Sequence, residues 1–383
     1  MREPEETTVA LKLLHTADWH LGRRFGRFDD EEERRLTRAR LDVVGRILDM
    51  AESRGVDGVL CAGDLFDEPS PREEWWQGLR KEIDRRNWTR PLFLLPGNHD
   101  PLTPRSIWDA DHPFRRALPD YVEVVDRDDF VYEFSEGAVL YAVPCRSHAG
   151  QGDPTEDIPQ REAGDERIRI GMVHGQTFDI EGHQTNFPIA GDAAAKRGLD
   201  YLALGDTHSF REIDSEAKAP TIYPGAPEAT SFDEEGAGNV ALIFFPLDRG
   251  RRATVERQRV ATWTWREETC SSLTALRELS LDEALRKSVL RLRLDLEVSL
   301  EEYDAVEELV RELGGSLSAH PRVGVLEVDR GGLRLQDASR DDFPEDLPPV
   351  LAEVVDRLSD ALALDGERSA RALHHLYRLV REG

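Results

Sequence analysis

The feature that most limits the fold of this chain is a repeated pattern, in which a short apolar run ends in Asp, Asn or His. The clearest case is the run Val59–Ala62, which leads through Gly63 to the carboxylate of Asp64. Open α/β sheets hold ligands at the carboxyl ends of their strands, so this turn would deliver Asp64 to a binding edge. One such aspartate means little, because loop aspartates also cap helices and form turns. Repetition along the chain is what favours a shared site.

Four further apolar runs end in the same way, at residues 11–14, 91–95, 168–173 and 201–204. The ligand-type residues that follow the five runs are Asp18, His20, Asp64, Asn98, His99, His174, Asp206 and His208. Asp18 and His20 are two positions apart, so in an extended chain they point to the same side. Asn98 offers an oxygen ligand without charge, and the adjacent His99 remains for proton chemistry. Each motif alone could be a turn or a cap, and only the whole set favours a site.

Oxygen and imidazole ligands without thiolates favour Mn²⁺, Fe or Zn²⁺ in a reactive centre over a structural zinc. The set is too large for one ion, whereas two ions about 3.5–4 Å apart that share one carboxylate would use it fully. Such a pair activates a water and clamps phosphate oxygens, so these residues predict phosphoester hydrolysis. The three cysteines, Cys61, Cys145 and Cys270, show no paired spacing, which argues against a disulfide framework or a zinc knuckle.

The formal net charge of -26 argues against a nucleic-acid partner, because phosphate contacts need Lys and Arg. Net charge does not exclude a local basic patch, and Arg23, Arg24 and Arg27 closely follow one ligand motif. We take these three as candidate DNA-binding residues, although solvated surface arginines are an equal alternative. No apolar run is long enough to cross a bilayer, and the acidic segment Met1–Thr8 does not resemble a signal peptide. We therefore expect a cytoplasmic protein without a membrane partner.

The composition shifts near Glu268, which predicts a first domain over residues 1–268. An alternating run, an amphipathic helix and another strand then predict a small α/β domain over 269–336. Residues 337–349 are acidic and contain proline, as is typical of a linker. Two amphipathic helices are expected within 350–383; they either fold back on the rest of the chain or bind a partner protein.

The ordered motifs resemble the calcineurin-like metallophosphoesterase superfamily. They are Asp18-x-His20, Gly63-Asp64, Gly97-Asn98-His99-Asp100, His174-Gly175 and Gly205-x-x-His208. The phrases Leu14–Gly22, Gly63–Asp67 and Tyr223–Glu228 look like its DNA-repair exonuclease branch, the SbcD-like and YhaO-like nucleases. The resemblance covers about residues 11 to 265. It implies a four-layer α/β/β/α sandwich, with the small domain as a capping, DNA-binding domain.

The resemblance also implies a Mn²⁺-dependent nuclease in DNA repair, cutting as an exonuclease or endonuclease. DNA and an SbcC-like ATPase, which would dock on the C-terminal helices, are the implied partners, and a homodimer is possible. Asp18, His20, Asp64 and His208 would hold one ion; Asp64, Asn98, His174 and Asp206 would hold the other. His99 would protonate the leaving oxygen or stabilise the scissile phosphate. Asp67 would orient His99.

One position departs from the branch, which usually has histidine where this chain has Asp206. Aspartate can still bind a metal through oxygen, but it adds charge and has a shorter reach, so the second ion could differ. Two alternatives to the nuclease hypothesis stay open. One is a small-molecule phosphodiesterase or phosphatase on the same core, and the other is a DNA-end-binding scaffold subunit with weak catalysis.

Overall fold

The computed structural model describes residues 9–86, 88–135, 137–177, 186–213, 219–246, 252–314, 322–336, 338–362 and 366–382. The acidic segment Met1–Thr8 and residue 337 of the expected linker lie outside these ranges. The chain divides into two compact units, Met1–Thr262 and Trp263–Gly383. Among the described residues, no helix has both the length and the apolar character that a membrane span requires.

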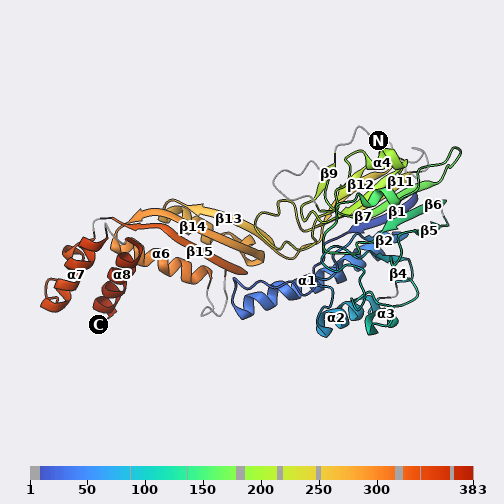
Figure 1. The fold of residues 1–383 in the computed structure, drawn as a ribbon. Helices are drawn as coiled ribbons and strands as arrows, with labels where there is room; N and C mark the ends of the chain where they lie inside the picture. Colours follow the sequence, from blue (N-terminus) through green and yellow to red (C-terminus); the bar gives the residue numbers. More distant parts are fainter. Residues whose placement is uncertain are drawn as a thin grey trace. The chain divides into compact units, whose positions relative to one another are not determined.

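The first unit is built on two six-stranded sheets (Figure 1). The first sheet has the order β12-β11-β1-β2-β3-β4, and β1 to β4 run parallel. Its strands are β1 (Val9–Thr16), β2 (Gly58–Cys61), β3 (Leu92–Leu94), β4 (Val122–Val124), β11 (Asn239–Pro246) and β12 (Thr254–Arg259). The second sheet has the order β5-β6-β7-β8-β10-β9. Its strands are β5 (Phe130–Phe134), β6 (Ala138–Val143), β7 (Ile168–His174), β8 (Tyr201–Gly205), β9 (Arg211–Ile213) and β10 (Thr221–Tyr223).

The two sheets pack face to face, and helices cover their outer faces. Successive strand residues point to opposite faces, so Leu13 and Leu60 join the core between the sheets while Leu14 and Val59 pack beneath the outer helices. On the first sheet these helices are α1 (Asp30–Arg54), α2 (Glu73–Asp84) and α3 (Pro113–Arg116). The second sheet is covered by α4 (Ala193–Arg197) and the 3-10 turn η1 (Pro154–Asp157). The expected α/β/β/α arrangement is therefore confirmed.

Helix α1 connects β1 to β2 and has clear start and stop signals. The side chain of Asp29 accepts hydrogen bonds from the main-chain N–H groups of Glu31 and Glu32, and the main-chain N–H of Asp29 donates to the side chain of Glu32, which completes a capping box. Gly55 ends the helix in the left-handed conformation, with φ of 60°. By contrast, α4 has only five residues, from Ala193 to Arg197.

The second unit has a three-stranded parallel sheet of order β13-β14-β15. Its elements are β13 (Thr264–Cys270), α5 (Leu273–Ser280), η3 (Glu283–Lys287), β14 (Ser288–Val298), α6 (Leu300–Leu313), β15 (Val325–Leu335), η4 (Arg340–Asp342), α7 (Pro349–Ala361) and α8 (Gly366–Glu382). The run over residues 255–265 is divided between two strands that belong to different sheets. Residues 254–259 pair with β11, and residues 264–270 pair with β14. Strand β13 therefore crosses the domain boundary that composition suggested at 268.

The C-terminal helices fold back onto the second unit. Buried Val355 of α7 and Leu373 of α8 share a core cluster with Leu300 at the start of α6. Phe343 and Leu347 of the expected linker are buried in the same cluster. Of the two arrangements that the sequence left open, the described residues thus adopt the packed one.

Candidate metal centre

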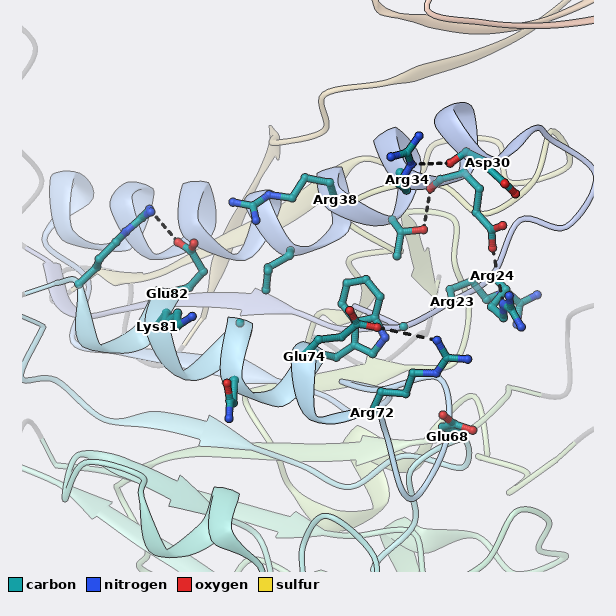
Figure 2. A pocket seen from close by; sticks show the side chains of 18 residues that line it. Arg23, Arg24, Asp30, Arg34, Arg38, Glu68, Arg72, Glu74, Lys81 and Glu82 are labelled. Carbon is teal, nitrogen blue, oxygen red and sulfur yellow. Dashed lines mark hydrogen bonds and ion pairs between the residues drawn. The ribbon is translucent and has the colours of Figure 1, made fainter.

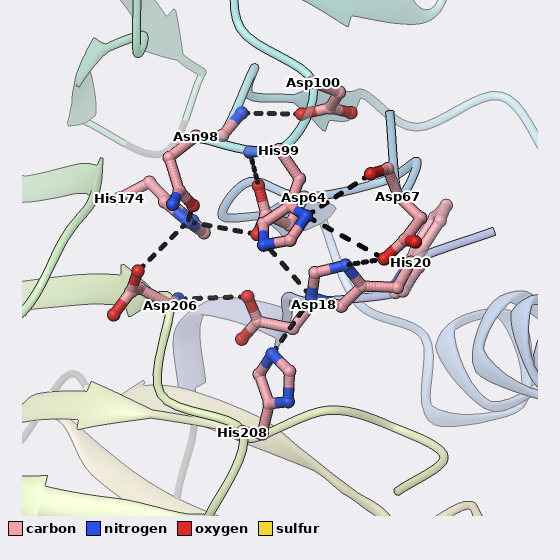
Figure 3. A network of polar contacts seen from close by, with 12 residues as sticks. Asp18, His20, Asp64, Asp67, Asn98, His99, Asp100, His174, Asp206 and His208 are labelled. Carbon is pink, nitrogen blue, oxygen red and sulfur yellow. Dashed lines mark hydrogen bonds and ion pairs between the residues drawn. The ribbon is translucent and has the colours of Figure 1, made fainter. Parts of the chain in front are cut away.

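The carboxyl ends of β1, β2, β3, β7 and β8 bring all seven predicted metal ligands into one buried cluster (Figure 3). Within the described ranges, three groups of side chains have ligand atoms that all lie within 4.8 Å of one another. These groups are Asp18-His20-His208, His20-Asp64-His99 and Asp18-Asp64-His174. The strand-end pattern thus corresponds to proximity in space.

Asp64 lies between the two halves of the cluster. Its Oδ2 is 3.5 Å from Nε2 of His20 and 3.5 Å from Nε2 of His174. Its Oδ1 accepts a hydrogen bond from the main-chain N–H of His99, at 2.9 Å. One carboxylate oxygen therefore faces both halves, as a shared ligand would.

The first half contains Asp18, His20 and His208, with Nε2 of the two histidines 3.0 Å apart. In the second half, Nε2 of His174 is 2.9 Å from Oδ1 of Asn98 and 3.9 Å from Oδ1 of Asp206. The shorter side chain of Asp206 still reaches the cluster.

Four ligand residues have a left-handed backbone that residues other than glycine seldom adopt. They are Asp18 (φ 55°), His20 (φ 43°), Asp64 (φ 54°) and Asp206 (φ 100°). Each such conformation costs about 1–3 kcal/mol and persists only where its surroundings hold it. Here two main-chain hydrogen bonds join the loop after β1 to the loop after β2. The N–H of Asp18 donates to the oxygen of Gly63 at 3.0 Å, and the N–H of His20 donates to the oxygen of Asp64 at 2.9 Å.

Two glycines of the motifs are required because a ligand side chain lies too close to them for a Cβ to fit. A Cβ on Gly63, which has φ of 99°, would lie 2.1 Å from Nδ1 of His174. A Cβ on Gly97 would lie 2.1 Å from Oδ1 of Asp64. Any side chain at either position would push a ligand out of place.

The three ligand histidines have different partners behind the ring. Nδ1 of His174 donates to the main-chain oxygen of Ala62 at 2.8 Å, whereas Nδ1 of His208 donates to the carboxylate of Glu234 at 2.6 Å. Nδ1 of His20 lies 3.2 Å from Oδ1 of Asp67, an ion-pair contact without hydrogen-bond geometry. In each case the Nε2 atom is left to face the cluster.

Sequence reasoning missed Glu234 and Arg40. Glu234 lies in a loop and carries no motif that would distinguish it from a surface acid. Arg40 looks like one of many helix arginines, yet it is buried, and its guanidinium donates to the main-chain oxygens of Trp19 (2.9 Å) and Glu228 (2.8 Å). It thereby supports the loop that carries Asp18 and His20.

Asp67 lies closer to His20 and Arg23 than to His99. Its Oδ1 is 3.0 Å from Nη1 of Arg23 and 3.8 Å from Nδ1 of His99. Nδ1 of His99 is instead within hydrogen-bond distance of the main-chain oxygen of Asp67, at 3.3 Å. The side chain of His99 is 40% exposed, unlike the buried ligands around it.

The buried cluster has an excess of carboxylate charge. Burial raises the pKa of Asp18 to about 6, and it also raises the pKa of Asp206. Burial alone would lower the pKa of His174, but the carboxylates of Asp64, Asp18 and Asp206 raise it to about 10. Without a cation, bound protons compensate the negative charge of the cluster.

These residues fit a pair of divalent cations. Oδ2 of Asp18 is fully buried and has no hydrogen-bond partner among the described residues. A buried carboxylate oxygen without a partner is costly unless a cation binds it. Mixed oxygen and imidazole donors suit Mn²⁺, Fe or Zn²⁺, and the negative charge calls for cations.

Arg23 and Arg24 line a groove of about 1250 Å³ between α1 and α2 (Figure 2). Seven basic and five acidic side chains line this α1–α2 groove, and Trp75 lies among them. Arg27 does not line it; its guanidinium stacks on the rings of Phe28 and Phe232, at 5.0 and 5.3 Å. Of the three arginines predicted to bind DNA, the structure therefore brings two to one groove.

Comparison with known proteins gives consistent matches. Residues 11–210 match the family described as calcineurin-like phosphoesterase. The chain is 36% identical to the SbcD component of the nuclease SbcCD from Escherichia coli (strain K12), over 96% of this chain and 97% of that protein. It is 30% identical to "Uncharacterized metallophosphoesterase YhaO" of Bacillus subtilis (strain 168), over 61% of this chain and 57% of that protein. It is 25% identical to the SbcD component of the B. subtilis nuclease SbcCD, over 61% and 66%, so both B. subtilis matches span less than two thirds of those proteins.

Proposed function

The chain belongs to the calcineurin-like phosphoesterase family, and we propose that it is a two-metal DNA nuclease that hydrolyses phosphodiester bonds. The observation that carries this proposal is the shared position of Asp64, whose Oδ2 lies 3.5 Å from an Nε2 atom on either side. The 36% identity to a protein named as part of a nuclease supports DNA as the substrate.

Asp18, His20, Asp64 and His208 would hold the first ion, and Asp64, Asn98, His174 and Asp206 the second. Once bound, such a pair activates a water and stabilises charge on the phosphate. The left-handed turns at Asp18, His20 and Asp64 fix these side chains before substrate arrives, so little reorganisation is needed.

His99 would serve as the acid that protonates the leaving oxygen, or would stabilise the scissile phosphate. Its 40% exposure supports this role, because a proton donor must be able to touch the substrate. Asp67 would contribute by holding Arg23, the first arginine of the α1–α2 groove, at 3.0 Å. The predicted orientation of His99 by the Asp67 carboxylate would need the present 3.8 Å separation to shorten.

We further propose Mn²⁺ as the native metal, an SbcC-like ATPase as partner and the cytoplasm as location. Oxygen-rich ligands with few imidazoles at the second ion favour a hard metal such as Mn²⁺ over Zn²⁺. The ATPase would dock on α7 and α8, where Val350 and Leu379 are 74% and 71% exposed. A homodimer is compatible with this proposal.

The α1–α2 groove would guide the DNA backbone. Its lining carries more basic than acidic side chains, although the whole chain has a net charge of -26. Arg23 would connect the groove to the centre through Asp67. Replacing Arg24 and Arg34 by alanine should weaken DNA binding and lower its salt dependence, by about 0.7–0.9 in slope per lost phosphate contact.

The test is hydrolysis of labelled linear duplex and single-stranded DNA with Mn²⁺, Mg²⁺ or EDTA, for the wild type and Asp64→Asn. Glu235→Asn is the matched control, because this exposed acid lies outside the cluster. Mn²⁺-dependent cleavage that Asp64→Asn abolishes and the control retains is the expected result.

A phosphodiester dye included in the same assay separates the alternatives. Dye hydrolysis without DNA cleavage, also after an SbcC-like ATPase is added, would favour a small-molecule phosphodiesterase. DNA binding without any hydrolysis would favour a scaffold role. Either outcome would overturn the nuclease proposal.

A further inference from the structure

The two halves of the metal centre differ in what lies behind their histidines. In the first half, His208 is backed by the carboxylate of Glu234 at 2.6 Å, and His20 lies 3.2 Å from the carboxylate of Asp67. In the second half, His174 is backed by the neutral main-chain oxygen of Ala62 at 2.8 Å.

We propose that Glu234 and Asp67 are positioning residues that make the first half, Asp18-His20-His208 with Asp64, the tighter of two unequal metal sites. The inference rests on the proposed two-metal function and adds to it an order of filling. The first half would bind its ion at lower metal concentration, and the second half would fill later.

The physical basis is the polarisation of imidazole by a carboxylate. A carboxylate that accepts the Nδ1 proton fixes the tautomer with its lone pair on Nε2, and it makes that nitrogen a stronger donor to a cation. It also adds a negative charge near the ion without occupying a coordination position. A main-chain oxygen fixes the tautomer equally well but brings no net charge.

Glu234 is itself held firmly. One of its oxygens accepts the main-chain N–H of Thr230 at 2.6 Å, the other accepts the Thr230 hydroxyl, and the side chain is only 12% exposed. A carboxylate fixed in this way cannot rotate away from His208, so its field acts constantly on the imidazole. A surface acid would be screened by water.

Two nearby arginines, Arg40 and Arg23, oppose the effect of these carboxylates on the metal affinity. Arg40 is buried beside the first half, and Glu234, Glu228 and Asp67 face its charge. Arg23 contacts Asp67 at 3.0 Å. Glu234 has no such arginine within ion-pair distance among the described residues, so we assign it the larger share of the effect.

The experiment is titration of the metal-free full chain with Mn²⁺ alone, in which calorimetry and the electron paramagnetic resonance signal of free Mn²⁺ report binding. The variants are Glu234→Ala, which removes both the hydrogen bond and the charge, and Glu234→Gln, which removes the charge alone. Asp206→Asn is the matched variant of the second half. Glu235→Gln is the surface control.

Two binding classes are expected for the wild type. Glu234→Ala should weaken the tight class by about 10- to 100-fold and leave the weak class nearly unchanged. Glu234→Gln should have a smaller effect on the same class. Asp206→Asn should weaken the weak class, and Glu235→Gln should change neither class.

The proposal is overturned if Glu234→Gln and Glu234→Ala bind Mn²⁺ as the wild type does, if they weaken the class that Asp206→Asn weakens, or if the wild type shows a single class. Circular dichroism of the metal-free variants shows whether they fold, and the isosteric Glu234→Gln decides if Glu234→Ala does not. Because no DNA is present, a failure of the nuclease proposal would leave this result intact.

Discussion

At the scale of single residues, the centre depends on backbone shapes and close approaches that few residue types permit. Four ligand positions have positive φ, and they are held by hydrogen bonds between neighbouring strand-end loops. Gly97 gives the loop after β3 access to Asp64. The glycines in these motifs are thus explained by the close approach of neighbouring loops.

Gly97→Ala should therefore disrupt the centre, because its Cβ would lie 2.1 Å from Oδ1 and 2.3 Å from the main-chain nitrogen of Asp64. We expect Mn²⁺ affinity and DNA cleavage to fall by at least about 100-fold, as a displacement of about 1 Å can cost that much in rate. Gly26→Ala is the control, since a Cβ there meets nothing within 4 Å. Equal behaviour of the two variants would contradict the close-approach argument.

Metal affinity should also rise with pH. Without metal, Glu234 raises the pKa of His208 to about 8 and Asp64 raises that of His174 to about 10, so both histidines hold protons at neutral pH. Burial raises the pKa of Asp18 to about 6, so this carboxylate gains a proton as the pH falls toward 6. Protons and cations compete for the same atoms, so lowering the pH weakens binding and binding releases protons. Calorimetry in two buffers of different ionisation enthalpy, between about pH 6 and pH 8, measures that release. An affinity independent of pH would contradict the expected competition.

At the scale of elements, α1 does more than cover the first sheet. Its buried residue Arg40 reaches main-chain oxygens on two separate loops, at Trp19 and at Glu228. The first of these loops carries the ligands Asp18 and His20. The helix therefore stabilises the centre from behind.

Arg40→Met should lower the free energy of unfolding by roughly 3 kcal/mol, because it leaves several buried carbonyl oxygens without donors. Arg38→Met is the control on the same helix; Arg38 is 63% exposed and pairs with Asp42, so we expect about 0.5 kcal/mol or less. Urea unfolding in EDTA measures both variants without a contribution from metal. A similar loss in the two would argue against the buried role of Arg40.

Local sequence signals were sufficient for the strand ends. The apolar runs and the residues that follow them predicted where the seven ligands would gather. Partners distant in sequence left no such signal. Neither Glu234 behind His208 nor Arg40 behind Trp19 follows a local pattern, and the run over 255–265 could not reveal that its two ends join different sheets.

At the scale of the whole molecule, the chain consists of two units with separate cores. The second unit is completed by its own C-terminal helices, since Leu373 of α8 packs with Leu300 and Phe343. A change in that core should therefore leave the metal centre intact.

Leu373→Ala should destabilise the second unit by about 2–5 kcal/mol, because the side chain is fully buried. Leu379→Ala, on the same helix and 71% exposed, should have little effect. Hydrogen exchange resolved by segment measures both, and Mn²⁺ binding should match the wild type. A fall in metal affinity in Leu373→Ala would show that the units are coupled.

The most direct test of the central claim is a crystal structure of the Mn²⁺-loaded protein with anomalous scattering recorded at the manganese edge. We predict two peaks about 3.5–4 Å apart, on either side of the Asp64 carboxylate, one beside His20 and His208 and the other beside His174 and Asp206. A single peak, or two peaks that Asp64 does not bridge, would contradict the two-metal centre.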